Sequence, residues 1–204
     1  MGSPRRGGNT QILVEQLMAG AASTQKHHVN MMFLDEYVKY AIGDCKHCRN
    51  ERGLCSINDR YEELLDAVLD CDCLVIGTPL YWYGPSGVTK NFIDRWFCYI
   101  SEAQPNYREV VRRMRGKKVV LAVACEETGH IVCGYLVGMI SEAVRYMEMQ
   151  LISVVIGDHS VRRGEVKRNE RAMSSAYWVG EHLDELQQRK FNVDSERPVS
   201  LAET

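Results

Sequence analysis

Three short runs of uncharged side chains, rich in valine, isoleucine and leucine, constrain the fold of this chain more than any other feature. They span residues 73–76, 119–123 and 151–156, and runs of this kind are typical of strands buried on both faces of a sheet. Segments with the apolar spacing of one helix face lie before, between and after these runs. The helical segments cover residues 11–22, 59–70, 88–100, 131–147 and 170–188. This alternation predicts an α/β fold with a parallel sheet and helices on both of its faces.

Residues 28–34 are expected to add one further strand, and residues 189–204 form a polar, aperiodic tail. We therefore expect one domain over residues 1–188, followed by this tail. With 45% hydrophobic and 25% charged residues, the composition excludes a disordered chain, and a net charge of −2 argues against a basic nucleic-acid binder. No apolar run is long enough for a membrane helix, and no secretory signal is recognisable, so a cytoplasmic location is expected.

The residues before the first helix have the chemistry of a phosphate site. Residues 2–10 read Gly-Ser-Pro-Arg-Arg-Gly-Gly-Asn-Thr, which supplies hydroxyls, an amide and two guanidinium groups where a helix begins. Free N–H groups at a helix N-terminus attract anions, and glycines let a phosphate approach the backbone. The loop is neither a Walker sequence nor Gly-x-Gly-x-x-Gly. A leader that only caps the helix through Asn9 or Thr10 is the alternative.

A second loop carries three aromatic residues directly after a buried strand. Residues 77–87 read Gly-Thr-Pro-Leu-Tyr-Trp-Tyr-Gly-Pro-Ser-Gly. In parallel sheets, ligands bind at the carboxyl ends of the strands, and a planar heteroaromatic ring is the natural partner of such a loop. The alternative is a hydrophobic loop that caps the core.

Together these loops resemble a known family. Residues 3–10, the stretch Gly77-Thr78-Pro79-Leu80-Tyr81-Trp82 and the stretch Lys90-x-Phe92-Ile93-Asp94-Arg95 are similar to the flavodoxin-like NAD(P)H-dependent FMN reductases, most of all to the branch that contains the iron–sulfur flavoproteins. The resemblance covers roughly residues 2–160. It implies a three-layer sandwich with strand order 2-1-3-4-5 and an FMN cofactor that carries the redox chemistry.

The resemblance also implies which residues hold FMN and what the protein does. The phosphate would lie at Ser3, Arg5, Gly8, Asn9 and Thr10, and the ribityl chain and ring at Pro79, Leu80, Tyr81, Trp82, Thr128 and Gly129. Electrons would pass from NAD(P)H to a quinone, a flavin or a protein, and hydride transfer requires no catalytic side chain. Two alternatives remain: an electron carrier with both FMN and an iron–sulfur cluster, and a non-enzymatic flavin-binding redox sensor.

Three cysteines form an incomplete metal motif. Cys45, Cys48 and Cys55 are spaced as C-x2-C-x6-C, whereas the cluster-bearing relatives have four cysteines in this insert, and Glu51 stands at one of their positions here. A [4Fe–4S] cluster normally takes four thiolates. Three readings stay open: no metal, a cluster with an unusual fourth ligand, or zinc. Cys98 is expected in the core, and Cys125 and Cys133 are expected to be structural.

Two further expectations concern the whole chain. Trp96, Phe97, Tyr99 and Ile100 spread around their helix, which predicts a homodimer or a dimer of dimers, as the resemblance also implies. A phosphate loop of this kind normally follows a buried strand, and only Met1 precedes it here. We therefore expect Met1 to be an internal residue of a longer native chain, with the missing strand being strand 1 of the order given above.

Overall fold

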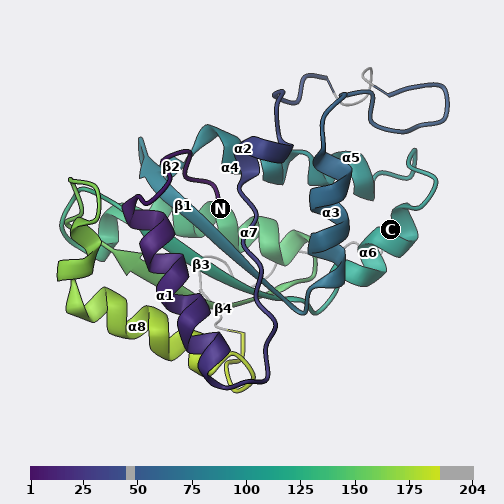
Figure 1. Cartoon of the computed structure of the whole chain (residues 1–204). Coiled ribbons are helices and arrows are strands. Elements are labelled where there is room, and N and C mark those ends of the chain that lie inside the picture. The colour runs from purple at the N-terminus through teal and green to yellow at the C-terminus, as the bar shows by residue number, and fades with distance from the viewer. Residues whose placement is uncertain (45–48, 189–204) are drawn as a thin grey trace.

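The computed structural model describes residues 1–44 and 49–188, and it arranges them in three layers (Figure 1). The elements are α1 (Asn9–Ser23), α2 (Leu34–Tyr37), α3 (Tyr61–Asp70), β1 (Cys73–Tyr81), β2 (Gly84–Pro85), α4 (Gly87–Asp94), α5 (Trp96–Ile100), α6 (Tyr107–Met114), β3 (Lys118–Ala124), η1 (His130–Cys133), α7 (Gly134–Tyr146), β4 (Gln150–Gly157), η2 (Glu165–Arg168) and α8 (Glu170–Glu181). Cys45, Cys48 and the expected tail at 189–204 lie outside the described residues.

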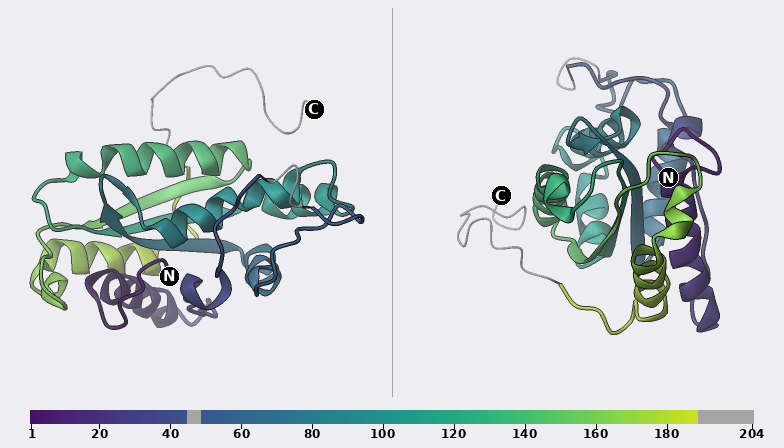
Figure 2. Two further views of the ribbon diagram at one scale, coloured as in Figure 1. Left: turned by 90° about the horizontal axis from the view of Figure 1, so that it is seen from above. Right: turned by 90° about the vertical axis from the view of Figure 1, so that its left-hand side faces the viewer.

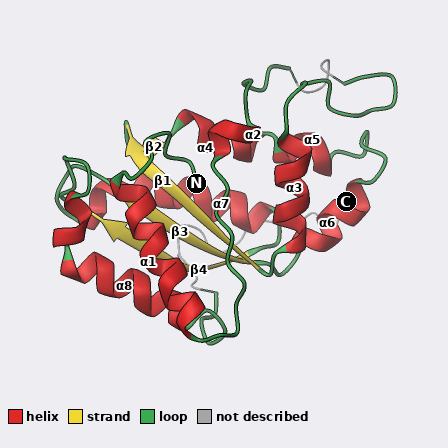
Figure 3. Cartoon of the chain, viewed as in Figure 1, coloured by secondary structure: helices red, strands yellow, loops and turns green. Residues whose placement is uncertain are grey.

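The central layer is a sheet of order β2-β1-β3-β4. β1, β3 and β4 are parallel, and each pairs with the next one along the chain, as expected for strands 3, 4 and 5 of the implied order. β2 is a two-residue strand that returns antiparallel to the end of β1. Figure 3 shows the three long strands running side by side with helices around them. The predicted parallel α/β architecture is therefore confirmed.

Helices cover both faces of the sheet, and each face has its own core (Figure 2). Val120 and Ala122 of β3 point to one face, where they pack with residues of α1 and α8. Val119 and Leu121 point to the other face, where α3 to α7 supply the packing partners. Both faces of β3 are fully buried, which explains why its sequence is a continuous apolar run.

The expected strand at residues 28–34 does not form. Residues 28–33 have no regular secondary structure, and residues 34–37 form α2. The segment meets Met1, whose carbonyl accepts a hydrogen bond from the Leu34 N–H at 2.9 Å, while the Gly2 N–H bonds to Gly77 O of β1 at 2.7 Å. The Met1 amine also donates to Met32 O at 2.6 Å, so Met1 makes two hydrogen bonds to this segment. Residues 1 and 2 are too short a stretch to extend this pairing into a ladder between the segment and β1.

The helix expected over residues 88–100 is divided into α4 and α5 at Arg95. Trp96, Tyr99 and Ile100 are buried in the chain's own core, whereas Phe97 is half-exposed. Core packing thus explains the spread of apolar residues that suggested a dimer interface on this helix. Among the described residues, no helix is both long and apolar enough to cross a bilayer.

Candidate functional site

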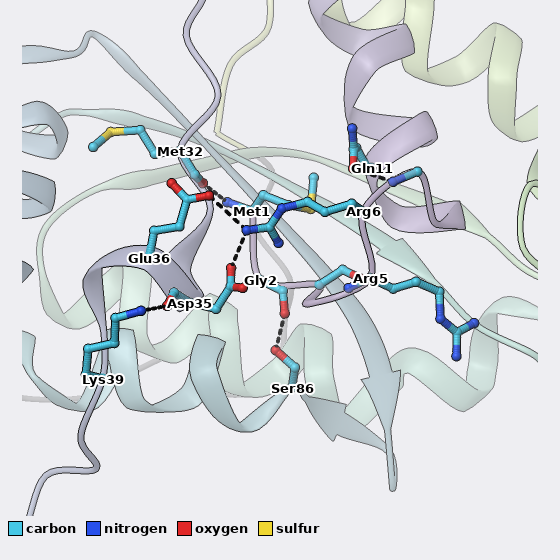
Figure 4. A network of polar contacts seen from close by, with 12 residues as sticks. Met1, Gly2, Arg5, Arg6, Gln11, Met32, Asp35, Glu36, Lys39 and Ser86 are labelled. Carbon is cyan, nitrogen blue, oxygen red and sulfur yellow. Dashed lines mark hydrogen bonds and ion pairs between the residues drawn. The ribbon is translucent and has the colours of Figure 1, made fainter.

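The first loop is packed against the carboxyl end of β1. The Ser86 hydroxyl donates a hydrogen bond to the Gly2 carbonyl at 2.6 Å (Figure 4). Ser86 also caps the N-terminus of α4, because its Oγ accepts from the Thr89 N–H. A Cβ atom on Gly2 would lie only 1.8 Å from Thr89 Oγ1. Glycine at position 2 is therefore required for this close approach, and the loop starts from a fixed point.

The rest of the loop turns sharply and opens α1. Gly7 has a φ of +64°, and its N–H donates to Gln11 Oε1 at 2.7 Å. Gly8 is the residue before the helix, and the first intrahelical bond runs from the Ile12 N–H to Gly8 O. The N–H groups of the three residues between them precede that bond and form the positive end of the helix dipole. The helix N-terminus can therefore receive an anion.

The two neighbouring arginines of this loop have different surroundings. Arg6 forms ion pairs with Asp35 at 3.1 Å and Glu36 at 2.9 Å, and its guanidinium stacks 3.7 Å from the centre of the Phe33 ring. Arg5 is exposed and extends away from this network (Figure 4). Of the two cations, Arg5 is thus the one whose charge is not already balanced by carboxylates within the described residues.

Asn9 connects the first loop to the loop after β4. Its Nδ2 donates to the carbonyls of Ser160 and Arg162, both at 2.9 Å, and its Oδ1 accepts from the Val166 N–H at 3.3 Å. Arg163 adds a bond from Nη2 to Arg6 O at 2.6 Å. The Asn9 side chain therefore holds two loops together. Neither Asn9 nor Thr10 caps α1, so the simple capping alternative does not describe this loop.

The aromatic loop forms a tight hairpin between β1 and β2. Tyr81 pairs with Gly84, and Trp82 and Tyr83 between them have φ values of +48° and +62°. Two successive positive φ values are typical of a type I′ turn, which normally takes Asn or Gly because other side chains are strained there. Trp82 is 96% exposed, and Tyr81 and Tyr83 are about half exposed, so these rings do not cap the core. A strained turn that presents aromatic rings to solvent is typical of a ligand site.

The loop after β3 completes the site. The Tyr83 hydroxyl donates to Glu127 Oε1 at 3.0 Å, which raises the pKa of Tyr83 and joins the hairpin to this loop. The Gly129 N–H donates to Asp158 Oδ2 at 2.9 Å, and this bond lowers the pKa of Asp158. Thr128 Oγ1 lies 3.2 Å from His159 Nδ1. The loops after β1, β3 and β4 therefore meet at the same edge of the sheet as the start of α1.

The residues predicted to hold FMN thus lie at one edge of the sheet, in these loops, at the start of α1 and at the end of β1. Ser3 of the first loop and Thr10 of α1 are buried, and Ser3 Oγ accepts from the Arg5 N–H at 3.3 Å. Pro79 and Leu80 are half-buried at the end of β1. Their contact with the cofactor stays a prediction. Sequence reasoning missed Gln11, Asp158 and Arg163, which hold the loops. For Arg163 the signal is the pair of adjacent arginines at residues 162 and 163, but such charge pairs on a surface are more often solvated.

The donor set fits a phosphate joined to a planar ring. One end of the site has the N–H groups of α1 and the guanidinium of Arg5, and another part has the exposed rings of the hairpin. The N–H groups and the cation suit a dianion, and the aromatic faces suit a flat heterocycle. The side chains present here are therefore compatible with FMN.

The cysteine motif falls partly outside the described residues. Cys45 and Cys48 lie outside the described residues, and the described part of the chain has no group of three or more His, Cys, Asp or Glu side chains that could hold a metal ion. The metal prediction for these cysteines stays a prediction. Cys55 lies beside Cys98, which is buried as expected. Cys125 and Cys133 are also buried, with their sulfurs 3.9 Å apart.

Comparison with known proteins gives a consistent result. Residues 1–159 match the family model of NADPH-dependent FMN reductases. The chain is 28% identical over 175 residues to YwqN of Bacillus subtilis, whose name describes an NAD(P)H-dependent FMN-containing oxidoreductase; the match covers 86% of this chain and 91% of that protein. An iron–sulfur flavoprotein of Methanocaldococcus jannaschii is 33% identical over 94 residues, which are 46% of this chain and 48% of the relative.

Among solved structures, the Trp repressor binding protein from Bacillus subtilis has the same fold, with a TM-score of 0.66 and 23% identity over 89% of this chain and 93% of that one. The flavodoxin-like three-layer fold is thereby confirmed. The site geometry and the family match over most of the chain lead to one conclusion: this protein belongs to the NADPH-dependent FMN reductase family, whose members are FMN-dependent oxidoreductases with NAD(P)H as reductant.

Proposed function

We propose that this protein holds FMN with its phosphate at the start of α1 and its ring at the hairpin of Tyr81 to Gly84. The observation that carries the proposal is the meeting of an anion-binding helix N-terminus and a strained aromatic turn at one edge of the sheet. Ser86 and Asn9 fix the two ends of the phosphate loop to neighbouring loops, so the donors are held in place before the ligand arrives.

The flavin, when bound, supplies the redox chemistry that connects NAD(P)H to an acceptor. This chain supplies binding and orientation. The N–H groups of α1 and the Arg5 guanidinium balance the phosphate charge, and the rings of Tyr81 and Trp82 provide flat apolar surfaces. The bond between Tyr83 and Glu127 sets the separation of the two loops that would flank the ring. No side chain needs to move a proton for hydride transfer, so we assign no catalytic residue.

For the electron acceptor we propose a small planar oxidant of the quinone class. The exposed Trp82 ring is an aromatic surface beside the proposed flavin-ring site. The nicotinamide and then a flat acceptor can stack there, one after the other. A protein acceptor would be expected to need a broad docking surface as well, and a free flavin remains the second candidate because it is also planar.

The binding mode is tested by comparing FMN with riboflavin, which has the same ring without the phosphate. The two ligands are titrated into the apoprotein while the quenching of flavin fluorescence is followed. The proposal expects FMN to bind far more tightly than riboflavin, and expects Arg5→Ala to remove much of that difference. Equal affinities for the two ligands in the unmodified protein would contradict a phosphate site in this loop.

We also propose that two copies pair beside this site. Ile131 of η1 is 88% exposed and Tyr135 at the start of α7 is 83% exposed, and α7 packs beside β2 of the aromatic hairpin. Exposed apolar side chains that adjoin a ligand site are typical of an interface that completes it. The pairing surface proposed here therefore differs from the α5 surface that the sequence suggested.

A cytoplasmic location is the remaining proposal. Its support is that Cys55, Cys71, Cys73, Cys98, Cys125 and Cys133 are all free thiols. Thiols persist in reducing compartments. Fractionation of cells that produce the protein tests this: the proposal expects it with the cytosolic contents, and recovery with the envelope fraction would contradict it.

A further inference from the structure

A pair of buried thiols lies at the two ends of the loop after β3. Cys125 is the first residue after this strand, and Cys133 is the last residue of η1, directly before α7. Cys125 is 4% exposed and Cys133 is fully buried, and their sulfurs are hydrogen-bond partners 3.9 Å apart. The sulfurs of a disulfide are about 2 Å apart, so a shift of about 2 Å would bring this pair to bonding distance.

The backbone holds Cys125 in place from both sides. Its N–H donates to Gly157 O at 3.1 Å, and its carbonyl accepts from the Ser160 N–H at 2.8 Å. Cys133 lies at the junction of η1 and α7, where the next residue, Gly134, is exposed. A Cβ atom on Gly134 would meet nothing within 4 Å, so open space adjoins this junction. Cys133 is therefore the thiol that can shift, and a small oxidant has a short path to it.

Cys133 has the surroundings of a reactive thiol. It is the N-cap residue of α7, a helix of 13 residues, and a helix N-terminus favours the anionic form of sulfur. The hydrogen bond with Cys125 lowers the pKa of the Cys133 thiol, although burial and the carboxylates of Asp158 and Glu127 act in the opposite direction. The thiolate is the nucleophilic form of a thiol. Cys133 is thus the sulfur that attacks an oxidant, and Cys125 is placed to resolve the product.

We propose that Cys133 and Cys125 form a redox-active dithiol that hydrogen peroxide oxidises to a disulfide. The Cys133 thiolate attacks one peroxide oxygen, an S–O bond forms, the O–O bond breaks and hydroxide leaves, so that Cys133 becomes a sulfenic acid. The Cys125 thiol then attacks the Cys133 sulfur. An S–S bond forms, the S–O bond breaks, and water leaves with the sulfenic oxygen and the thiol proton. Peroxide takes two electrons in all, both from this pair.

The pair spans the loop that the proposed flavin site uses. Thr128 and Gly129 lie between the two cysteines, and so does Glu127, which accepts from the Tyr83 hydroxyl at 3.0 Å. A disulfide would close residues 125–133 into a ring and tie the two ends of this loop together. The reaction takes no electrons from the flavin, so the inference stands whether or not FMN binds beside this loop as proposed.

The bond can be mapped directly, because two proteases place the cysteines on separate peptides. Trypsin and Glu-C together release Cys125 on residues 119–126 and Cys133 on residues 128–142, each as the sole cysteine of its peptide. The FMN-loaded full chain is treated with a slight excess of hydrogen peroxide, catalase is added, and the remaining thiols are alkylated with iodoacetamide in denaturant. Mass spectrometry without reductant is expected to show 119–126 joined to 128–142, with loss of both alkylated peptides. Dithiothreitol added before alkylation should restore them.

Two variants sharpen this test. Cys125→Ser should abolish the joined peptide and leave Cys133 as a sulfenic acid, which dimedone labels on 128–142. The matched control Cys71→Ser changes a thiol outside the pair and should leave the joined peptide at its full yield. If Cys125→Ser does not fold, the result on the unmodified protein still decides. Peptide 128–142 that stays alkylated after peroxide treatment, becomes a sulfinic acid, or is joined to a cysteine other than Cys125 would overturn the proposal.

Discussion

Arg5 and Arg6 are adjacent in the sequence, but their side chains have different surroundings in the fold. Arg6 is paired with two carboxylates, whereas Arg5 is exposed beside the N-terminus of α1. Replacing Arg5 by Ala should weaken FMN by about 2 kcal/mol, since a charge-assisted contact to the phosphate is lost. Riboflavin affinity should stay unchanged. Isothermal titration with both ligands measures the effect.

Arg6→Ala is the matched control for this prediction. It removes the same charge one residue away, from a side chain that faces Asp35 and Glu36, so the ratio of the FMN and riboflavin affinities should stay close to that of the unmodified protein. An equal loss of FMN affinity in the two variants would show that net charge, and not contact from Arg5, holds the phosphate.

The Cys55 thiol supplies a pH prediction. The hydrogen bond with Cys98 lowers the pKa of the Cys55 thiol to about 5, whereas burial raises the pKa of the Cys71 thiol above its ordinary value. Iodoacetamide reacts with thiolates, so alkylation of Cys55 should already be near its full rate at pH 7, and should fall as the pH drops through 5. Cys71 should react appreciably only in alkaline solution. Peptide-resolved alkylation rates check this, and equal pH profiles would contradict it.

At the scale of single residues, the sequence predicts which residues form a site better than it predicts where their side chains point. The small and polar residues of the first loop indicated an anion site, but nothing in the local pattern shows that Arg6 turns toward Asp35 or that Asn9 bonds to the loop after β4. Those partners are about 30 and 150 residues away in the chain. Their positions follow from the packing of whole elements, which no local window contains.

The hairpin between β1 and β2 combines strain with exposure. Trp82→Ala and Trp82→Gly both remove the ring, but only glycine also relieves the positive φ. The glycine variant should therefore be more stable to unfolding than the alanine variant by about 1 kcal/mol. Both should weaken FMN and riboflavin to a similar extent, because the ring is common to the two ligands. Denaturant melts and ligand titrations measure the two effects, and a weakening confined to FMN would contradict the placement of the ring.

Helices α1 and α8 touch through glycines. A Cβ atom on Gly180 would lie 2.0 Å from Leu17 O, and one on Gly20 would lie 2.0 Å from Tyr177 O. Gly180→Ala should thus destabilise the fold by ~1–3 kcal/mol, because the helices must separate. Gly138→Ala, in α7 with nothing within 4 Å of the added atom, is the control and should gain up to ~1 kcal/mol from helix propensity. Similar denaturation midpoints for the two variants would contradict this close packing.

The helices and strands were largely predictable where the hydrophobic periodicity of the sequence was clear. The three apolar runs became β1, β3 and β4 because both of their faces are covered. Residues 28–34 failed as a strand because strand formation needs a partner ladder, which the local sequence cannot reveal. α6 was missed since its charged residues hide a narrow apolar stripe formed by Val110 and Met114. At the break between α4 and α5, Arg95 is buried against Asp59, a contact that the local sequence does not reveal.

At the scale of the whole molecule, the exposed side chains beside the site predict self-association. Ile131→Asp combined with Tyr135→Asp should shift the protein from dimer to monomer, because charges would replace apolar contacts at the interface. Trp178→Ser, on the half-exposed face of α8, is the control and should leave the dimer intact. Sedimentation velocity with FMN present measures both. A monomeric unmodified protein at micromolar concentration would contradict the proposed pairing.

In the function proposed above, the sheet edge is a platform that binds FMN and exposes its ring to NAD(P)H and to an acceptor. Anaerobic titration of the FMN-loaded protein with NADPH tests this most directly, with the long-wavelength absorption of the flavin as readout. We predict that one equivalent of NADPH bleaches the flavin, and that a quinone added afterwards restores the oxidised spectrum. A bound flavin that stays oxidised in excess NADPH and NADH would contradict the account.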